Sequence, residues 1–154
     1  LDELHTLGEK LVNAIDGTAE DVTGEGSVDQ FPYQFGILND DGYIDLILSD
    51  ISEVSAQVDP TDPIKDFGNN AYDCTQLIEE KATDASDSAS TATASAAADI
   101  AVTLLETADE SLGYAVNGQD GDDEGTDVDP VTEGTLSCSI YYISEMMRMR
   151  VLTP

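Results

Sequence analysis

Acidic side chains are spread through most of this sequence, and they constrain its fold more than any single motif does. Asp and Glu together number 33, against 5 Lys and Arg, which gives a formal net charge of −28 on 154 residues. A charge of this size is typical either of a disordered chain or of a folded protein whose charges are screened. Leu, Ile, Val and Phe make up 36 of the 154 residues, or about 23%, and disorder becomes the default expectation only below roughly 20%. The composition therefore predicts one folded domain over residues 1–154, with a small core.

The distribution of the acids indicates the environment of the protein. They are spread along the whole chain, Asp (21) outnumbers Glu (12), and only three Lys are present. This usage resembles that of proteins from extreme halophiles, where molar salt shortens the Debye length to about 3 Å and screens self-repulsion. The alternative is a DNA mimic or acidic inhibitor, which should concentrate its carboxylates on one face.

Targeting signals are absent from the sequence, and its cysteines match no known motif. No apolar run reaches the 18 or more residues of a membrane span, and no signal sequence opens the chain, so no membrane partner is expected. Because the sequence begins at Leu1 without Met, it is interpreted as a processed or trimmed product. Cys74 and Cys138 have no zinc or redox spacing. They are either two buried free thiols or one disulfide.

The first half of the chain predicts a helix, a linker and a β-hairpin. Residues 1–16 carry an apolar stripe at helical spacing, and Gly17 follows as a helix stop. A polar linker spans 17–30. Residues 31–51 contain two β-prone apolar runs joined by "NDDG", a turn sequence that favours an antiparallel hairpin. The stripe of the predicted helix consists of Leu4, Leu7, Leu11 and Ile15.

The second half predicts a loop and two helices. The segment "VDPTDPIKDFG" at 58–68 contains prolines typical of a loop, and 69–84 is interpreted as a short helix. Residues 86–113 predict a long Ala-rich helix that ends at Gly113. Its small residues suit close packing, although the low-complexity first half is alternatively a flexible linker.

The last segment, 134–154, predicts a strand. Leu136, Cys138, Ile140 and Tyr142 alternate with polar or exposed positions, which is the pattern of a half-buried strand. With the preceding elements, this gives an α+β fold: an antiparallel or mixed sheet, with the N-terminal helix and the Ala-rich helix packed on it.

Contacts between copies of the chain are expected at the last strand and at the Ala-rich helix. The apolar edge and the cations of the strand, together with the small residues of the helix, suit a subunit interface. The predicted interface residues are Met147, Met149, Arg148, Arg150, Ala89, Ala92 and Ala96.

The acidic loop at 117–133 is the only candidate for a metal site. Asp120, Asp122 and Glu124 match positions 1, 3 and 5 of a calcium-binding loop, but Val128 and Val131 occupy positions 9 and 12, where ligands are needed. We therefore predict a solvated acidic loop and no metal.

No pattern in the sequence predicts an enzyme or a cofactor. His5, the only histidine, has no Cys or Ser nucleophile beside it in sequence. The chain also lacks a phosphate-binding glycine loop with Lys, and it lacks the basic aromatic patch of a nucleic-acid-binding protein. We expect neither catalysis nor specific nucleic-acid binding.

The predicted order of elements is similar to that of the tail-terminator proteins of long-tailed phages and archaeal viruses. The resemblance is carried by the helix "ELHTLGEKLVNAI", the strand "FPYQFGIL", and a step at "LGY" that leads through the Asp-rich loop into "LSCSIYYI". It implies a non-enzymatic virion subunit that forms a ring joining tail to head, with other copies and other virion proteins as partners. The alternatives are an extracellular cell-surface or filament subunit of a halophile, and a soluble binding module.

Overall fold

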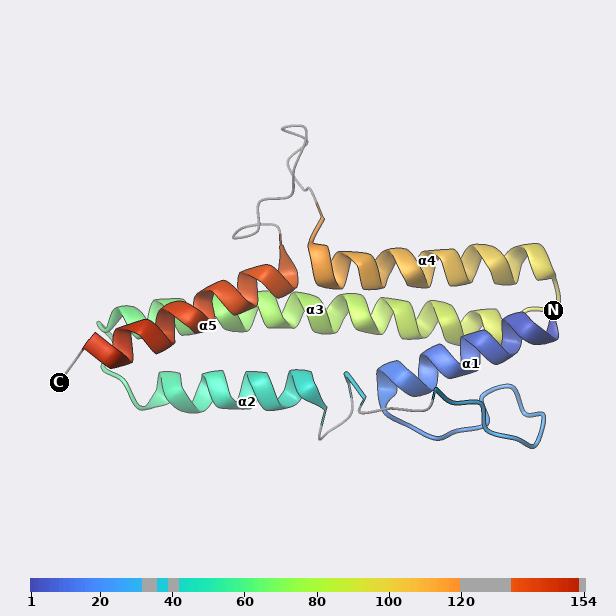
Figure 1. Ribbon diagram of the computed structural model, residues 1–154, viewed down its shortest axis with the longest axis horizontal. Helices are drawn as coiled ribbons and strands as arrows, with labels where there is room; N and C mark the ends of the chain where they lie inside the picture. The colour runs from blue at the N-terminus through green and yellow to red at the C-terminus, as the bar shows by residue number, and fades with distance from the viewer. Residues whose placement is uncertain (32–35, 39–41, 120–133, 153–154) are drawn as a thin grey trace. The chain divides into compact units, whose positions relative to one another are not determined.

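The computed structural model describes residues 1–31, 36–38, 42–119 and 134–152, and the regular structure in these ranges is helical (Figure 1). No described residue belongs to a β-strand, so the predicted α+β fold with an antiparallel or mixed sheet is wrong. The helices are α1 (Asp2–Asp16), α2 (Tyr43–Ala56), α3 (Pro63–Thr93), α4 (Ala98–Asn117) and α5 (Thr135–Leu152).

The predicted hairpin at 31–51 is wrong because its second apolar run forms α2. The run continues to Ala56 and is 14 residues long, which exceeds the usual length of a strand. Ile44 and Ile51 are buried, and Ile47 and Val54 pack against a core, so the buried positions follow helical spacing. The "NDDG" segment precedes this helix instead of joining two strands, and its residues 39–41 lie outside the described ranges.

The predicted last strand is also wrong, because 135–152 forms α5. Alternation over 136–142 fits a strand, but the buried positions follow the helical spacing of Thr135, Cys138, Ser139 and Met146. A short apolar run fits both the two-residue period of a strand and the helical period of about 3.6 residues. Here only the full length of the segment distinguishes a helix from a strand.

The N-terminal helix is confirmed as α1. Asp2 and Glu3 lie in its first turn, where the helix dipole favours negative charge, and Gly17 ends it in the left-handed conformation with φ of 68°. His5 Nε2 lies 2.8 Å from the carbonyl oxygen of Ser95, so the ring donates a hydrogen bond to the turn after α3.

The boundaries of α3 and α4 differ from the predicted loop and helices. Asp62 Oδ1 accepts a hydrogen bond of 2.9 Å from the amide of Ile64, and Pro63 occupies the first helical position, so the second proline of the predicted loop starts α3. The Ala-rich segment is interrupted at 94–97, and α4 runs past Gly113 to Asn117. Gly118, with φ of 79°, follows its end.

The chain forms two compact units, and each is built from two separate stretches of sequence. Leu1–Asp45 and Glu79–Leu112 form the first unit, and Leu46–Ile78 and Gly113–Pro154 form the second. Both α3 and α4 therefore contribute residues to both units.

The core of the first unit is an alanine stripe on α3 packed against α1 and α4. Val12 and Ile15 of α1 and Leu105 of α4 lie in the same core. At Gly8 the backbones of α1 and α3 approach closely, because an added Cβ atom would lie 3.0 Å from the carbonyl oxygen of Ala89. The stripe consists of Ala82, Ala85, Ala89 and Ala92, each 0–1% exposed.

The polar stretch after α1, predicted as a linker, is held against that helix by two buried side chains, Glu9 and Asn13. The Glu9 carboxylate accepts amide hydrogen bonds from Thr23 (2.9 Å) and Asp29 (2.6 Å). The Asn13 amide donates to the carbonyl oxygens of Glu20 and Asp29 and accepts from Thr18 and from the Glu20 amide. Both side chains are 0% exposed.

Candidate helix-binding groove

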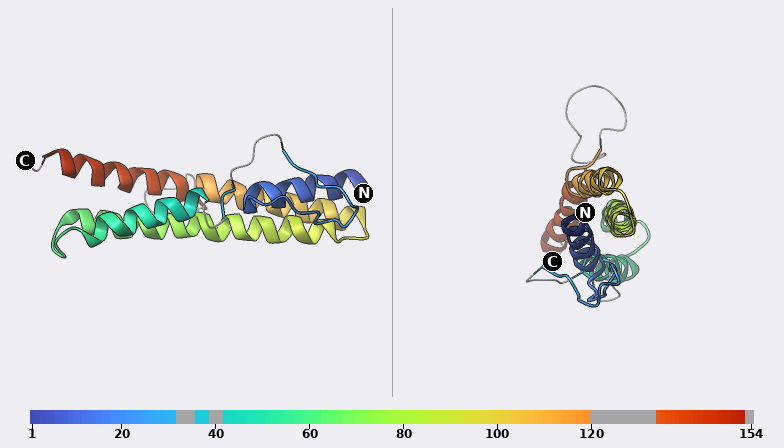
Figure 2. Two further views of the ribbon diagram at one scale, coloured as in Figure 1. Left: turned by 90° about the horizontal axis from the view of Figure 1, so that it is seen from below. Right: turned by 90° about the vertical axis from the view of Figure 1, so that its right-hand side faces the viewer.

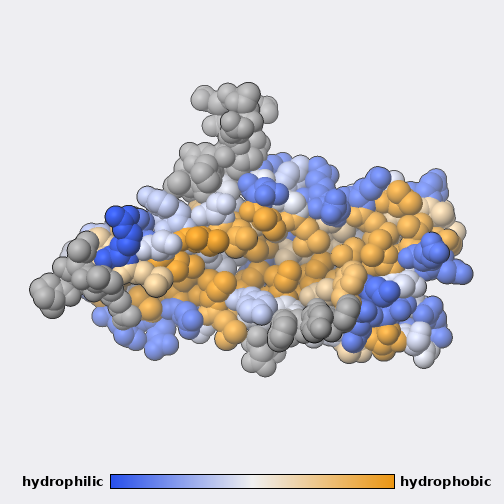
Figure 3. Space-filling model, in the orientation of Figure 1, coloured by the Kyte–Doolittle hydropathy of each residue, from blue (hydrophilic) through white to orange (hydrophobic). Residues whose placement is uncertain are grey.

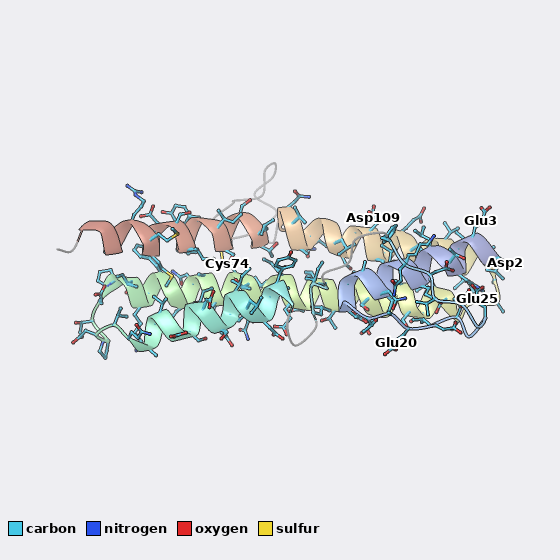
Figure 4. The ribbon with its side chains drawn as sticks, turned by 60° about the horizontal axis from the view of Figure 1, so that its bottom comes forward. Asp2, Glu3, Glu20, Glu25, Cys74 and Asp109 are labelled. Atoms are coloured by element: carbon cyan, nitrogen blue, oxygen red, sulfur yellow. A yellow bond between two sulfur atoms is a disulfide. The ribbon has the colours of Figure 1, made fainter. Side chains whose placement is uncertain are left out.

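Three helical segments of the second unit define its interior. Cys74 of α3 forms a disulfide with Cys138 of α5, so the predicted pair of cysteines is bonded (Figure 4). One residue further along each helix, the buried hydroxyl groups of Thr75 and Ser139 lie 2.9 Å apart in a hydrogen bond. These two contacts fix α5 on α3.

α2 packs on the opposite end of the same α3 segment, where glycine permits a close approach. A Cβ atom at Gly68 would collide with the Ser55 side chain of α2 and would lie 3.4 Å from Met146 Cε of α5. The Phe67 and Tyr142 rings, with centroids 6.2 Å apart, extend the contact between α3 and α5. Gly68 therefore permits both helices to approach α3 closely.

α2 and α5 run in the same direction, and the first half of α3 runs opposite to both (Figures 1 and 2). The contacts agree, since residue numbers on α3 rise as those of their partners on α5 fall, from Gly68 with Met146 to Cys74 with Cys138. The second unit is therefore a three-helix arrangement with two parallel members.

An open apolar groove of about 250 Å³ lies between α2 and α5. Figure 3 shows apolar residues gathered between these helices. Among the described residues of the lining, Asp50 contributes the only charged side chain, and Met147, which is 66% exposed, contributes the most accessible apolar one. The lining consists of Ile47, Asp50, Ile51 and Val54 from α2 and Ile143, Met146 and Met147 from α5.

The structure separates the residues predicted at a subunit interface. Met147 lines the groove, and the neighbouring Arg148 keeps 73% of its side chain exposed while Nη1 pairs with Glu145 Oε1 at 2.6 Å. Met149 packs on the core of the second unit. Ala96 is exposed in the turn between α3 and α4.

The remaining predicted interface residues do not lie on a described surface. Ala89 and Ala92 are 0% exposed inside the core of the first unit, so their side chains are occupied by packing within the chain. Arg150 is in the last turn of α5, and its side chain lies outside the described part of the structure. The α2 side of the groove was not predicted, because that segment was expected to form a hairpin.

The candidate metal residues Asp120, Asp122 and Glu124 lie outside the described residues. Across the described ranges, no group of three or more His, Cys, Asp or Glu side chains could hold a metal ion. None of the described helices combines the length and apolar character needed to cross a membrane.

Comparison of the chain with protein-family models, with curated proteins and with solved structures finds no match.

Proposed function

We propose that the chain is a non-enzymatic structural subunit adapted to high salt, which assembles by accepting a helix in the groove between α2 and α5. The groove is the observation that carries the proposal. The described residues of its lining are apolar apart from Asp50, whereas a catalytic site needs several convergent polar groups.

The spacing of the lining residues suits a helical partner. Ile47, Ile51 and Val54 recur at i, i+4 and i+7 on α2, which is the arrangement that packs against the apolar face of another helix. Ile51 is buried in the core of the second unit, whereas Ile47 and Val54 are only partly buried against it. Met146 and Met147 supply flexible thioether side chains on the other wall, and methionine adapts well to the shape of a bound partner.

The predicted position in a tail-terminator ring loses the final strand, one of the features that supported it. The segment "LSCSIYYI" was expected to be the final strand, and it lies in α5. The disulfide supports the alternative of a cell-surface or filament subunit, because disulfides persist in oxidising surroundings outside the cytoplasm. We therefore favour an extracellular assembly over a particle built in the cytoplasm.

Site-specific photocrosslinking in the native host tests the groove. A photoreactive amino acid at Met147 should give a covalent adduct with an assembly partner, because this side chain lines the groove and is exposed. The same probe at Ser137, an exposed α5 residue outside the groove lining, is the matched control. Equal labelling from both positions, or none from Met147, would contradict the proposed function.

A further inference from the structure

The surface of α5 carries a second apolar stripe beside its buried face. Ile143 and Met147 line the groove, and Leu136 and Ile140 continue the same stripe towards the start of the helix. Spacing at i, i+4, i+7 and i+11 places these four residues on one side of a helix. Leu136 is 39% exposed, Ile140 55% and Met147 66%. α5 therefore has an apolar side available for contact in addition to the side that packs on α3.

The charges beside this stripe are complementary between α5 and the groove. Asp50 lies in the lining of the groove. Arg148 directly follows Met147, and its guanidinium is largely exposed although one nitrogen pairs with Glu145. Arg148 and Arg150 are two of only five Lys and Arg residues in the chain. A second copy of α5 thus offers both the apolar stripe that the groove can cover and a cation for Asp50.

The direction of the helices favours the same partner. Because α2 and α5 are parallel (Figure 2), a helix in their groove is best placed antiparallel to both, with opposed helix dipoles. A twofold axis perpendicular to α5 makes the α5 of a second copy antiparallel to the first. A single twofold rotation therefore places α5 of a second copy antiparallel to α2 and α5, which is the orientation that the groove favours.

We infer that the groove is filled by α5 of a second copy of this chain, in a twofold-symmetric dimer. The inference rests on the proposed function, because it names the partner of the same groove. Met147 lies near the axis, and Arg148 of each copy pairs with Asp50 of the other. Since a twofold interface repeats every contact, the ion pair and the contacts of the apolar stripe each form twice.

Charge exchange between Asp50 and Arg148 tests this pairing in sedimentation equilibrium at molar KCl. The wild-type chain should be a dimer. Asp50→Arg and Arg148→Asp should each weaken dimerisation by at least about 100-fold, because each places like charges together twice. An equimolar mixture of the two variants should form heterodimers, because one ion pair then forms as in the wild-type dimer and the other forms with its charges exchanged. The mixing experiment does not depend on the folding of a chain that carries both substitutions.

Thr103→Asp, which adds an acid at an exposed position of α4 and on neither α2 nor α5, is the control and should leave the dimer mass unchanged. Circular dichroism confirms that each variant is folded. A monomeric wild-type chain, or variants that fail to associate when mixed, would overturn the inference. If the Met147 probe crosslinks to a different protein while the purified chain is monomeric, the groove function stands and self-pairing is wrong. Failure of crosslinking at Met147 would instead count against both.

Discussion

At the scale of single residues, the most consequential side chains are polar ones buried on α1. Burial by itself would raise the pKa of the Glu9 carboxyl, but the amide hydrogen bonds from Asp29 and Thr23 outweigh it, and the pKa lies below the ordinary 4.5. Glu9 and Asn13 are one helical turn apart, so both face the following segment. Together they add polar contacts to the apolar contact that Val22 makes with the core of the first unit.

Replacing the buried Glu9 carboxylate with an amide should destabilise the protein only at pH values at which the carboxylate is charged. Glu9→Gln keeps one acceptor but turns an amino group towards the second backbone amide, so we expect a loss of about 2 kcal/mol in unfolding free energy at neutral pH. A lowered folded-state pKa contributes stability that is present above the ordinary value of 4.5 and is lost as pH falls through the folded-state pKa. The deficit should therefore shrink in acid, as measured by urea denaturation from pH 7 downwards.

Glu3→Gln is the matched control, since Glu3 is exposed on the same helix (Figure 4). It should change the unfolding free energy by less than about 0.5 kcal/mol. An equal deficit for Glu9→Gln at acidic and neutral pH would show that the charge of the carboxylate is not what binds the segment.

At the scale of elements, α5 is held by a covalent bond as well as by packing. Cys74 and Cys138 are 64 positions apart, so the disulfide restricts a long stretch of the unfolded chain. The hydrogen bond between Thr75 and Ser139 lies beside it. The position of α5, and with it one wall of the groove, depends on this pair of contacts.

Removing the disulfide should lower stability without abolishing the fold. The Cys74→Ser, Cys138→Ser double variant should lose about 2–4 kcal/mol of unfolding free energy, the typical contribution of a disulfide. Guanidinium denaturation with and without a phosphine reductant measures the effect. Reductant should destabilise the wild-type chain and leave the double variant unchanged. A wild-type chain indifferent to reductant would mean that the bond contributes nothing to stability.

The elements differ in how well the sequence predicted them. α1 was predicted because its apolar spacing, its acidic first turn and Gly17 all agree. The segments of α2 and α5 are rich in Ile and Tyr, whose β propensity favoured strands, and tertiary packing outweighed that preference. Met147 and Arg148 were predicted as contact residues of a last strand, and that segment forms α5. Asp50 could not be found, because no spacing in the sequence indicates which helix lies beside α5.

At the scale of the whole molecule, charge is the dominant constraint. Among the described residues, the ion pairs involve only Lys81 and Arg148. With 33 acids and 5 Lys and Arg residues, most carboxylates cannot be neutralised within the chain. Their mutual repulsion opposes the compact state unless ions screen it.

Thermal stability should therefore rise steeply with salt. The Debye length falls from about 10 Å at ~0.1 M salt to about 3 Å at ~1 M, so we expect the melting temperature to increase by roughly 10 °C or more over this range and beyond. Circular dichroism melts in KCl measure it. Sucrose at equal osmolarity stabilises by exclusion without screening and should have a smaller effect. A melting temperature that does not change with KCl would contradict adaptation to salt.

The interleaving of the two units has a consequence for synthesis of the protein on the ribosome. Leu1–Asp45 emerges first, but it must wait until Leu112 has been made before the first unit has all its residues. The second unit begins at Leu46 and gains α5 only after Thr135–Leu152 has been translated. The disulfide between Cys74 and Cys138 can form only after Cys138 has emerged from the ribosome. A chain that stops prematurely after α4 therefore contains every residue of the first unit and leaves α2 and the start of α3 without the helix that covers them.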